Sequence, residues 1–278
     1  MNYVLLDFDG YVVKSYYASI SKEKEGNDTP LDILTNLEEE TIERAKSFFN
    51  SEDLCVCKIM SGHTFKKDIF PGYKGRRKKD EELGKFRDWV KENYDGVLVA
   101  ENLEADDLIT FINAMSGYTS LVFSDDKDLR KYNPIVGRIN PTEDIIETYG
   151  DLLPEQLIQM ITGDSIDSIR GIYGKGEVYA RKYLDKNGYT FTNVIKAFKE
   201  NNIDIDECFK NLVEVIPLIP EFMDENYEQV CLDAEEQFII NGKWEYSTTM
   251  KLIEGFMRYI NKQVKEVYTN DDKNQKTT

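Results

Sequence analysis

Residues 161–176 read Ile-Thr-Gly-Asp-Ser-Ile-Asp-Ser-Ile-Arg-Gly-Ile-Tyr-Gly-Lys-Gly, and the rest of the chain is best understood outward from them. The first half carries Asp164 and Asp167, a spacing that lets one helical turn or a tight loop direct both carboxylates to a common point. The second half has three glycines within six residues, which frees the backbone to present N–H groups to phosphate. A surface loop with a glycine-rich turn has the same features. The alternative is a metal-directed acidic pair beside a phosphate-binding hairpin, which suits an enzyme that cuts a nucleic-acid backbone.

The composition is that of a soluble globular protein. The 278 residues suffice for one large domain or a domain plus a smaller one, and 31% are charged against 41% apolar. No segment approaches the roughly 18 consecutive apolar residues of a membrane span, and no signal peptide precedes the first apolar run. Four cysteines without a Cys-x-x-Cys pair, together with one histidine, do not support a zinc cluster. We therefore expect a cytoplasmic protein that does not contact membranes.

The charge balance gives two opposing indications. The net charge of −17 argues against general nucleic-acid binding, because phosphate contact usually requires a basic surface. Residues 66–79, however, hold seven Lys and Arg in fourteen positions. The acidic residues elsewhere either form a solvated surface or gather around bound cations, and the total charge does not separate these possibilities.

Apolar segments alternate with helical patterns through the first half of the chain. The predicted strands cover residues 3–8, 54–60, 97–100 and 118–123, with a fifth over 135–139, and the predicted helices cover 30–49, about 80–93 and 105–115. This alternation predicts an α/β fold with a mainly parallel central sheet flanked by helices. Helices dominate from 151 to about 266, so we expect a first domain over 1–150, a helical subdomain over 151–269 and a disordered tail over 270–278.

Acidic residues follow the ends of successive predicted strands. The candidate metal ligands are Asp7, Glu104, Asp106, Asp126, Asp128, Asp164 and Asp167. In open parallel sheets, sites form at the carboxyl ends of strands, so these separate segments can converge. Each group alone is also explained as a helix start or a capped turn. Gathered together, the carboxylates would repel one another unless cations neutralised them, and oxygen ligands select Mg²⁺ or Mn²⁺. Two such ions about 4 Å apart can hold a phosphodiester for attack by water.

Five motifs occur in an order that resembles the structure-specific 5′-nuclease family, and they span about residues 3–185. That family includes flap endonucleases, the 5′-nuclease domains of bacterial DNA polymerase I and phage 5′→3′ exonucleases. The matching segments are Asp7 with Lys14-Ser15-Tyr16-Tyr17-Ala18, Phe65-Lys66 with Pro71-Gly72-Tyr73-Lys74-Gly75-Arg76-Arg77, Leu103-Glu104-Ala105-Asp106-Asp107, Ser124-Asp125-Asp126-Lys127-Asp128-Leu129, and Gly163 to Gly176. No single motif is specific, but the five in this order are.

The resemblance implies a fold and a set of residue roles. It implies a PIN-like nuclease core with a basic arch segment at about 65–95, and a helix–hairpin–helix at about 155–187. Glu104 and Asp106 would mainly serve one metal ion, and Asp126, Asp128 and Asp164 the other, with Asp7 and Asp167 nearby. Lys74 and Arg77 would contact the scissile phosphate as catalytic residues, and Tyr73 would stack on a displaced base. The residues expected to bind nucleic acid are Lys14, Lys66, Tyr73, Arg76, Arg170, Gly171, Gly174, Lys175 and Gly176, and the helix–hairpin–helix would hold K⁺.

The same resemblance implies an activity and its partners. The enzyme would cut DNA or an RNA–DNA hybrid near a 5′ end, on branched, nicked or 5′-ended duplex substrates, in phage replication or primer removal. We expect a monomer that acts in the cytoplasm, which is the host cytoplasm if a phage encodes it, alongside a single-strand-binding or replication protein.

One position departs from the family pattern. The family usually has an aspartate at the end of the second strand, where this chain has Ile59 next to Lys58. One metal ion would then be held more weakly, or Lys58 would replace part of its charge. The departure also leaves open a catalytically inactive nucleic-acid-binding protein.

A phosphatase of the haloacid-dehalogenase type is the main alternative enzyme. Leu5-Leu6-Asp7-Phe8-Asp9-Gly10 resembles the Asp-x-Asp-Gly opening of that class, with Asp7 as nucleophile and Asp9 as general acid. This interpretation leaves the basic segment 65–79, the acids at 104–107 and the three-glycine hairpin without a role.

Overall fold

The structure is a computed structural model that describes residues 2–22, 28–75, 78, 80–140, 146–148, 153–218, 222 and 246–275. The chain forms two compact units. The first comprises Met1–His63, Lys78–Gly150 and Glu235–Tyr246, and the second comprises Thr64–Arg77, Asp151–Ala234 and Ser247–Thr278. The second unit therefore includes the start of the basic segment, whereas the predicted first domain covers residues 1–150.

A six-stranded sheet forms the centre of the first unit, in the order β3-β2-β1-β4-β5-β6. The strands are β1 (Asn2–Asp7), β2 (Leu54–Thr64), β3 (Val97–Asn102), β4 (Leu121–Phe123), β5 (Ile135–Gly137) and β6 (Ile146–Thr148). β1 is parallel to β2 and β4, and β4 is parallel to β5, while β6 pairs antiparallel with β5. The predicted mainly parallel sheet is confirmed. The antiparallel edge strand β6 was not predicted.

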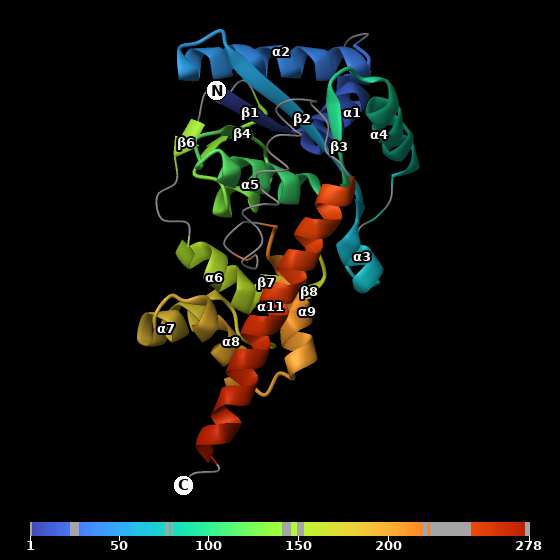
Figure 1. Ribbon diagram of the computed structural model, residues 1–278. Coiled ribbons are helices and arrows are strands. Elements are labelled where there is room, and N and C mark those ends of the chain that lie inside the picture. Colours follow the sequence, from blue (N-terminus) through green and yellow to red (C-terminus); the bar gives the residue numbers. More distant parts are fainter. Residues whose placement is uncertain are drawn as a thin grey trace. The chain divides into compact units, whose positions relative to one another are not determined.

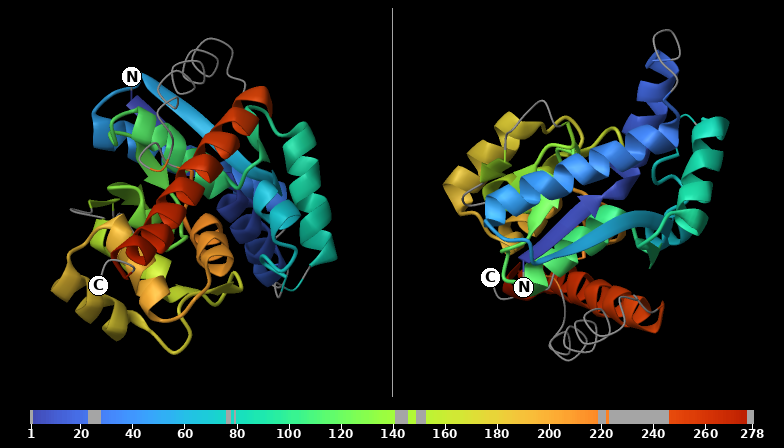
Figure 2. Two further views of the ribbon diagram at one scale, coloured as in Figure 1. Left: turned by 60° about the horizontal axis from the view of Figure 1, so that its bottom comes forward. Right: turned by 90° about the horizontal axis from the view of Figure 1, so that it is seen from above.

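Helices cover both faces of this sheet. They are α1 (Phe8–Lys22), α2 (Pro30–Phe49), α4 (Glu81–Asn93) and α5 (Ala105–Met115). Val4 and Leu6 of β1 pack with residues of α1, α2 and α4 in one buried core, and α2 lies across β1 and β2 on this face (Figure 2, right). α5 covers the other face (Figure 1). Because side chains alternate along a strand, Leu5 and Asp7 point to the α5 face.

The first strand leads directly into a helix. α1 begins at Phe8, the residue after Asp7, and its Tyr11 is fully buried with a hydroxyl that donates to Thr41 Oγ1 at 2.9 Å. The hydrophobic pattern did not predict this helix, although the matching segment Lys14–Ala18 lies within it. The abrupt strand-to-helix junction leaves the Asp7 carboxylate at the carboxyl end of the sheet, where sites of parallel sheets form.

The second unit is mainly helical. Its elements are α3 (Phe65–Ile69), α6 (Leu153–Thr162), β7 (Gly163–Asp164), β8 (Ile169–Arg170), α7 (Glu177–Asn187), α8 (Phe191–Glu200), α9 (Ile205–Val215) and α11 (Tyr246–Gln275). All residues of α11 except the first, Tyr246, belong to this unit. α6 packs against α7, α8 and α9. α11 continues to Gln275, so the tail predicted to be disordered from residue 270 starts inside a helix, and residues 276–278 lie outside the described chain.

The segment 161–176 joins α6 to α7. β7 and β8 form a two-residue antiparallel pair in which Gly163 is opposite Arg170 and Asp164 is opposite Ile169. The Ile172 backbone N–H then donates to Ile161 O at 2.9 Å, which ties the glycine-rich turn back to the end of α6. The order helix, hairpin, helix over 153–187 therefore exists within this unit.

Membrane insertion finds no support in the helices. None of the helices in the described part of the chain combines the length and apolar content that crossing a lipid bilayer demands.

Candidate active site

Asp7 lies at the centre of the acidic site in the first unit. Ser124, which is fully buried at the end of β4, donates its hydroxyl to Asp7 Oδ2 at 2.6 Å. Burial raises the pKa of the Asp7 carboxyl to about 7, the Ser124 hydrogen bond opposes this rise, and repulsion from Asp9 and Asp126 adds to it. A carboxylate in this position would be stabilised by a nearby cation, since a cation offsets both burial and repulsion.

Ser124 also orders the acidic loop after β4. Its Oγ accepts the Asp126 backbone N–H at 2.9 Å, and Asp126 Oδ1 in turn accepts the Asp128 backbone N–H at 2.8 Å. The Asp126 side chain is exposed, whereas Asp128 is half-buried and accepts a hydrogen bond from Lys131 Nζ at 2.7 Å. One serine thus connects the acid of β1 to the acidic loop after β4. Sequence reasoning missed Ser124, although it lies inside the motif that drew attention to Asp126 and Asp128.

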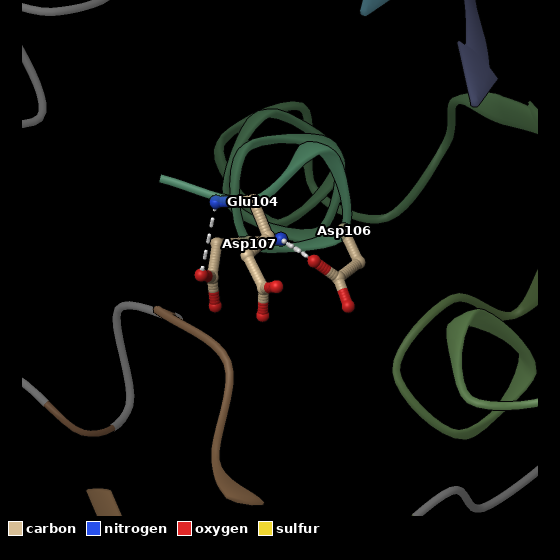
Figure 3. A group of neighbouring side chains, drawn as sticks. All are labelled: Glu104, Asp106 and Asp107. Atoms are coloured by element: carbon tan, nitrogen blue, oxygen red, sulfur yellow. Dashed lines mark hydrogen bonds between the residues drawn. The ribbon is translucent and has the colours of Figure 1, made fainter. Parts of the chain in front are cut away.

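A second acidic group opens α5. Glu104, Asp106 and Asp107 each offer a carboxylate oxygen within 4.8 Å of the others, and the three side chains point to the same side of the helix start (Figure 3). Glu104 is the N-cap residue, and its backbone N–H donates to Asp107 Oδ2 at 3.4 Å. Glu104 is 6% exposed and Asp107 is fully buried. Asp107 was not among the predicted ligands, yet the helix geometry places its carboxylate in the same group.

The acids of the central stretch lie in the helical unit. Asp164 Oδ1 accepts the backbone N–H groups of Ile166 at 2.7 Å and Asp167 at 3.4 Å, which closes a tight turn. This turn brings Asp167 close to the predicted catalytic lysine: Lys74 Nζ lies 3.5 Å from Asp167 Oδ2, and the Lys74 backbone N–H donates to Asp167 O at 3.0 Å. The convergence of these two acids with the acids of the first unit stays a prediction.

Lys74 has an unusual backbone conformation. Its φ is +54°, in the left-handed region that a residue with a side chain seldom adopts. Such strain typically persists at functional sites, where surrounding contacts enforce it. Here the enforcing contacts are the backbone and side-chain bonds to Asp167.

Tyr73 is buried rather than presented for stacking. The side chain is 4% exposed, and two ammonium groups lie near its ring, with Lys74 Nζ 5.2 Å and Lys66 Nζ 5.9 Å from the ring centroid. Protein covers this ring, and Lys66 is equally buried, at 4% exposure. The stacking of Tyr73 on a displaced base and the contact of Lys66 with nucleic acid stay predictions.

The glycines of the hairpin fall into two kinds. A side chain at Gly171 would overlap the carbonyl of Thr162, so this glycine permits close packing of the hairpin on α6. At Gly174 and Gly176, by contrast, no heavy atom lies within 4 Å of the place that a Cβ would take, so the backbone there is open to a ligand. Lys175 Nζ lies 4.7 Å from the Tyr179 ring centroid, and Arg170 is exposed on β8, where it lines a cavity of about 790 Å³ with Ser168 and Lys210.

Other predicted basic residues are only partly described. Arg76 and Arg77 lie outside the described residues. Lys14 of α1 forms an ion pair with Asp125 at 3.0 Å, next to Asp126 in sequence.

Ile59 stands in β2 where the family usually has an aspartate, and its side chain is uncharged. Ile59 is fully buried and lies opposite Asp7 in the parallel pairing of β1 and β2. Lys58, which was expected to replace part of the charge of a weakly held metal ion, is turned to the other face of the sheet by the strand alternation. There its Nζ lies 2.9 Å from Glu38 Oε1 and 5.0 Å from the Tyr94 ring centroid.

Asp9 has a structural role that conflicts with the phosphatase interpretation. Its Oδ2 accepts the Ser61 backbone N–H at 2.8 Å, and its Oδ1 forms an ion pair with Arg87 of α4. A carboxylate held on both oxygens in this way is not placed to give a proton to a leaving group. The interpretation of Asp9 as a general acid is therefore wrong for this structure.

The donor set suits a hard divalent cation. The groups described above contain carboxylate and hydroxyl oxygens, which Mg²⁺ and Mn²⁺ prefer. Three carboxylates converge at α5, and burial among like charges raises the pKa of Asp7 to about 7. The first unit thus contains an acidic cluster able to hold a metal ion.

Comparisons with known proteins agree with this arrangement. Residues 2–137 match the family model described as 5′-3′ exonuclease, N-terminal resolvase-like domain. The 5′-3′ exonuclease of Mycoplasmopsis pulmonis is 26% identical over 296 residues, covering 97% of this chain and 96% of that protein. DNA polymerase I of Bacillus subtilis is 36% identical over 204 residues, covering 64% of this chain and 22% of the polymerase. This chain spans about a quarter of the length of the DNA polymerase I relatives that it matches.

A solved structure has a similar fold. A complex of the bacteriophage T5 flap endonuclease with DNA and metal ions matches with a TM-score of 0.57 and 16% sequence identity, over 95% of this chain and all (100%) of that one. At this level of identity the match shows that the two chains share a fold.

Proposed function

Because residues 2–137 match the family model of 5′-3′ exonuclease N-terminal resolvase-like domains, we propose that this chain is a divalent-metal-dependent 5′→3′ exonuclease and flap endonuclease. Its proposed substrates are phosphodiesters of DNA or RNA–DNA hybrids near 5′ ends, in branched, nicked or 5′-ended duplexes. The observation that carries the proposal is the set of acids at the carboxyl ends of β1, β3 and β4, tied together by Ser124 and by the start of α5.

Two divalent cations, Mg²⁺ or Mn²⁺, are the proposed cofactors. When bound, such ions polarise the scissile phosphate and activate water for attack. The residues that would hold them are the acids of the first unit, Asp7, Glu104, Asp106, Asp126 and Asp128, together with Asp164 and Asp167 of the second. The 4.8 Å grouping at α5 and the raised pKa of Asp7 support this assignment.

The basic residues of the helical unit have a separate proposed role. Lys74 donates to the scissile phosphate and stabilises its developing negative charge, and Arg77 assists it. The ion pair with Asp167 holds the Lys74 ammonium near an acid that belongs to the proposed site. The open backbone at Gly174 and Gly176 supports binding of duplex phosphates at the hairpin, flanked by Arg170 and Lys175. K⁺ at this hairpin is part of the same proposal.

The proposed working state is a monomer in the cytoplasm. A DNA substrate in replication or primer removal would place it with other replication proteins, including a single-strand-binding protein. The T5 flap endonuclease complex, which contains DNA and metal ions, supports the choice of DNA as substrate.

Digestion of defined substrates tests the proposal. The 5′-labelled flap, nicked duplex and RNA–DNA hybrid are incubated with increasing Mg²⁺ or Mn²⁺, beside a small phosphate monoester. We expect metal-dependent release of 5′ fragments and no turnover of the monoester. Asp128→Asn and Asp164→Asn should abolish cleavage while leaving flap binding, as expected of metal ligands. The exposed Asp95→Asn serves as the matched control and should cut at the wild-type rate.

Two results would reject the proposal. Monoester turnover without flap cleavage would favour a phosphatase, despite the ion pair that occupies Asp9. Flap binding without cleavage at any metal concentration would identify an inactive nucleic-acid-binding protein, in which Ile59 has cost the site its function.

A further inference from the structure

Tyr132 has a buried hydroxyl that lacks a hydrogen bond. The residue is 5% exposed, and no partner for its Oη is found within the described part of the chain. A buried hydroxyl without a partner loses its hydrogen bonds to water and gains none in return, so native proteins seldom keep one without a reason. Phenylalanine would fill the same space without this cost. The hydroxyl therefore calls for an explanation beyond packing.

The position of Tyr132 is fixed relative to α5. Tyr132 ends the short 3₁₀ helix η1 (Leu129–Lys131) that Asp128 begins, and its backbone N–H donates to Leu129 O at 3.3 Å. The next residue, Asn133, is fully buried and anchors this turn. Its Nδ2 donates to Thr110 Oγ1 at 3.3 Å, and its Oδ1 accepts from Asn113 Nδ2 at 2.8 Å.

Thr110 connects this anchor to the acids at the start of α5. It lies four residues after Asp106 and three after Asp107, so the three side chains share one face of the helix. The Asn133 contact with Thr110 therefore seats the η1 turn on the face of α5 that begins with these two acids. Tyr132, which lies between Asn133 and the η1 turn that begins at Asp128, is therefore close to α5.

The electrostatics of the phenol agree with this placement. Burial raises the pKa of Tyr132, and the negative charges of Asp128, Asp106 and Asp107 raise it further. The hydroxyl consequently stays protonated at neutral pH and is available as a hydrogen-bond donor. Among the described residues, no acceptor lies within hydrogen-bond distance of this hydroxyl.

We propose that Tyr132 is a positioning residue of the metal site, whose hydroxyl donates a hydrogen bond to an oxygen ligand of a divalent cation held by Glu104, Asp106 and Asp107. The ligand is a water molecule that accompanies the cation, or a carboxylate oxygen drawn toward it. This inference rests on the proposed function, because it requires that the acidic group binds metal. It adds a residue outside the acidic motifs to the machinery that orients the ion, as partners of metal ligands commonly do.

Titration of the whole protein with Mn²⁺ tests the role of the hydroxyl without reference to cleavage. Free Mn²⁺ is followed by electron paramagnetic resonance for the wild type and for Tyr132→Phe. We expect Tyr132→Phe to weaken Mn²⁺ binding by about 10- to 100-fold, the usual cost of removing a group that supports a metal ligand. In EDTA, the same variant should melt at the wild-type temperature or higher, because it removes a hydroxyl for which the described residues provide no partner.

Tyr94→Phe is the matched control. The Tyr94 hydroxyl donates to Glu38 Oε2 at 2.7 Å, away from the acidic group. Its removal should lower the melting temperature and leave Mn²⁺ affinity unchanged, the reverse of the Tyr132 pattern. A purely structural tyrosine at 132 would behave like Tyr94.

The outcomes separate the inference from the function on which it rests. Wild-type protein that binds no Mn²⁺ would overturn both. Equal Mn²⁺ affinities of the wild type and Tyr132→Phe would overturn the role of Tyr132 alone, and the nuclease proposal would stand. Weaker binding by Tyr132→Phe, together with an unchanged or raised melting temperature in EDTA, would support the inference.

Discussion

The Asp7 carboxylate couples stability to pH through its burial. Its pKa is raised from an ordinary value near 4 to about 7, so the folded protein binds this proton more tightly than the unfolded chain does. The stability that comes from the protonated carboxyl is fully present below about pH 4 and is lost as the pH rises through 7. A shift of this size corresponds to roughly 4 kcal/mol at most, and water near the partly exposed side chain lowers that figure.

Asp7→Asn should therefore stabilise the metal-free protein at high pH. The amide stays neutral, so in EDTA at pH 8 the variant should exceed the wild type by about 2 kcal/mol in free energy of unfolding. At pH 4 the difference should vanish because both side chains are uncharged. Thermal melts over this pH range check the prediction, and a variant that is less stable than the wild type at pH 8 would contradict it. The variant should also lose cleavage activity.

Lys74→Ala isolates the contribution of one cation to turnover. Removing a donor to the scissile phosphate should lower kcat by about 10²-fold or more, with a smaller effect on KM. Single-turnover cleavage of a flap measures the change. Lys85→Ala is the control, since Lys85 is exposed and pairs with Glu82 within α4. Normal turnover by Lys74→Ala would remove this lysine from the site and leave the pair with Asp167 as a structural contact.

At the scale of elements, the hairpin between α6 and α7 contains one glycine that serves folding and another that is proposed to bind nucleic acid. Gly171 packs against the end of α6, while the backbone at Gly176 faces open space at the start of α7. Similar glycines in one short motif thus serve different purposes. Both were predicted to bind nucleic acid because they occur in one motif.

Substitution of these two glycines should give opposite results. Gly171→Ala should lower the free energy of unfolding by about 2–4 kcal/mol, since the added methyl group overlaps the Thr162 carbonyl. Gly176→Ala should change stability by less than about 1 kcal/mol and should weaken duplex binding, because the methyl group occupies the open face of the backbone. Denaturant melts and duplex-binding titrations measure the two effects. Equal stability of the two variants would contradict this division.

At the scale of the whole molecule, the acidic excess should make stability depend on metal. The chain has 52 acidic and 35 basic residues, and the acids at α5 lie within 4.8 Å of one another. Mn²⁺ binds the folded site and not the separated acids of the unfolded chain, so it should stabilise by about 2.7 kcal/mol at a concentration 100 times Kd. Melting curves in EDTA and in Mn²⁺ check this, with Asp128→Asn as the variant that should lose most of the gain. Identical curves would show that the acids hold no ion.

The sequence by itself determined the parts of this protein that depend on local pattern. Apolar segments of β1, β2, β3 and β5 and the helical periodicity of α2, α4 and α5 predicted a parallel sheet flanked by helices, and acids at the strand ends indicated where a site would form. These features follow from side-chain spacing along the chain, which any stretch of sequence displays directly. α1 and β6 are exceptions that the hydrophobic pattern did not predict; the mixed Gly, Val and Tyr content of α1 gives a weak helical pattern, although the helix packs against α2.

Only the tertiary structure decided which side chains meet. Ser124 bonds Asp7, Lys58 turns away to Glu38, Tyr73 is buried against Lys66 and Lys74, and the Tyr132 hydroxyl has no hydrogen-bond partner among the described residues. The first two contacts join residues distant in sequence, and all four outcomes depend on the low polarity that burial creates. Neither these contacts nor the burial can be read from spacing along the chain, because both arise when strands and helices pack together.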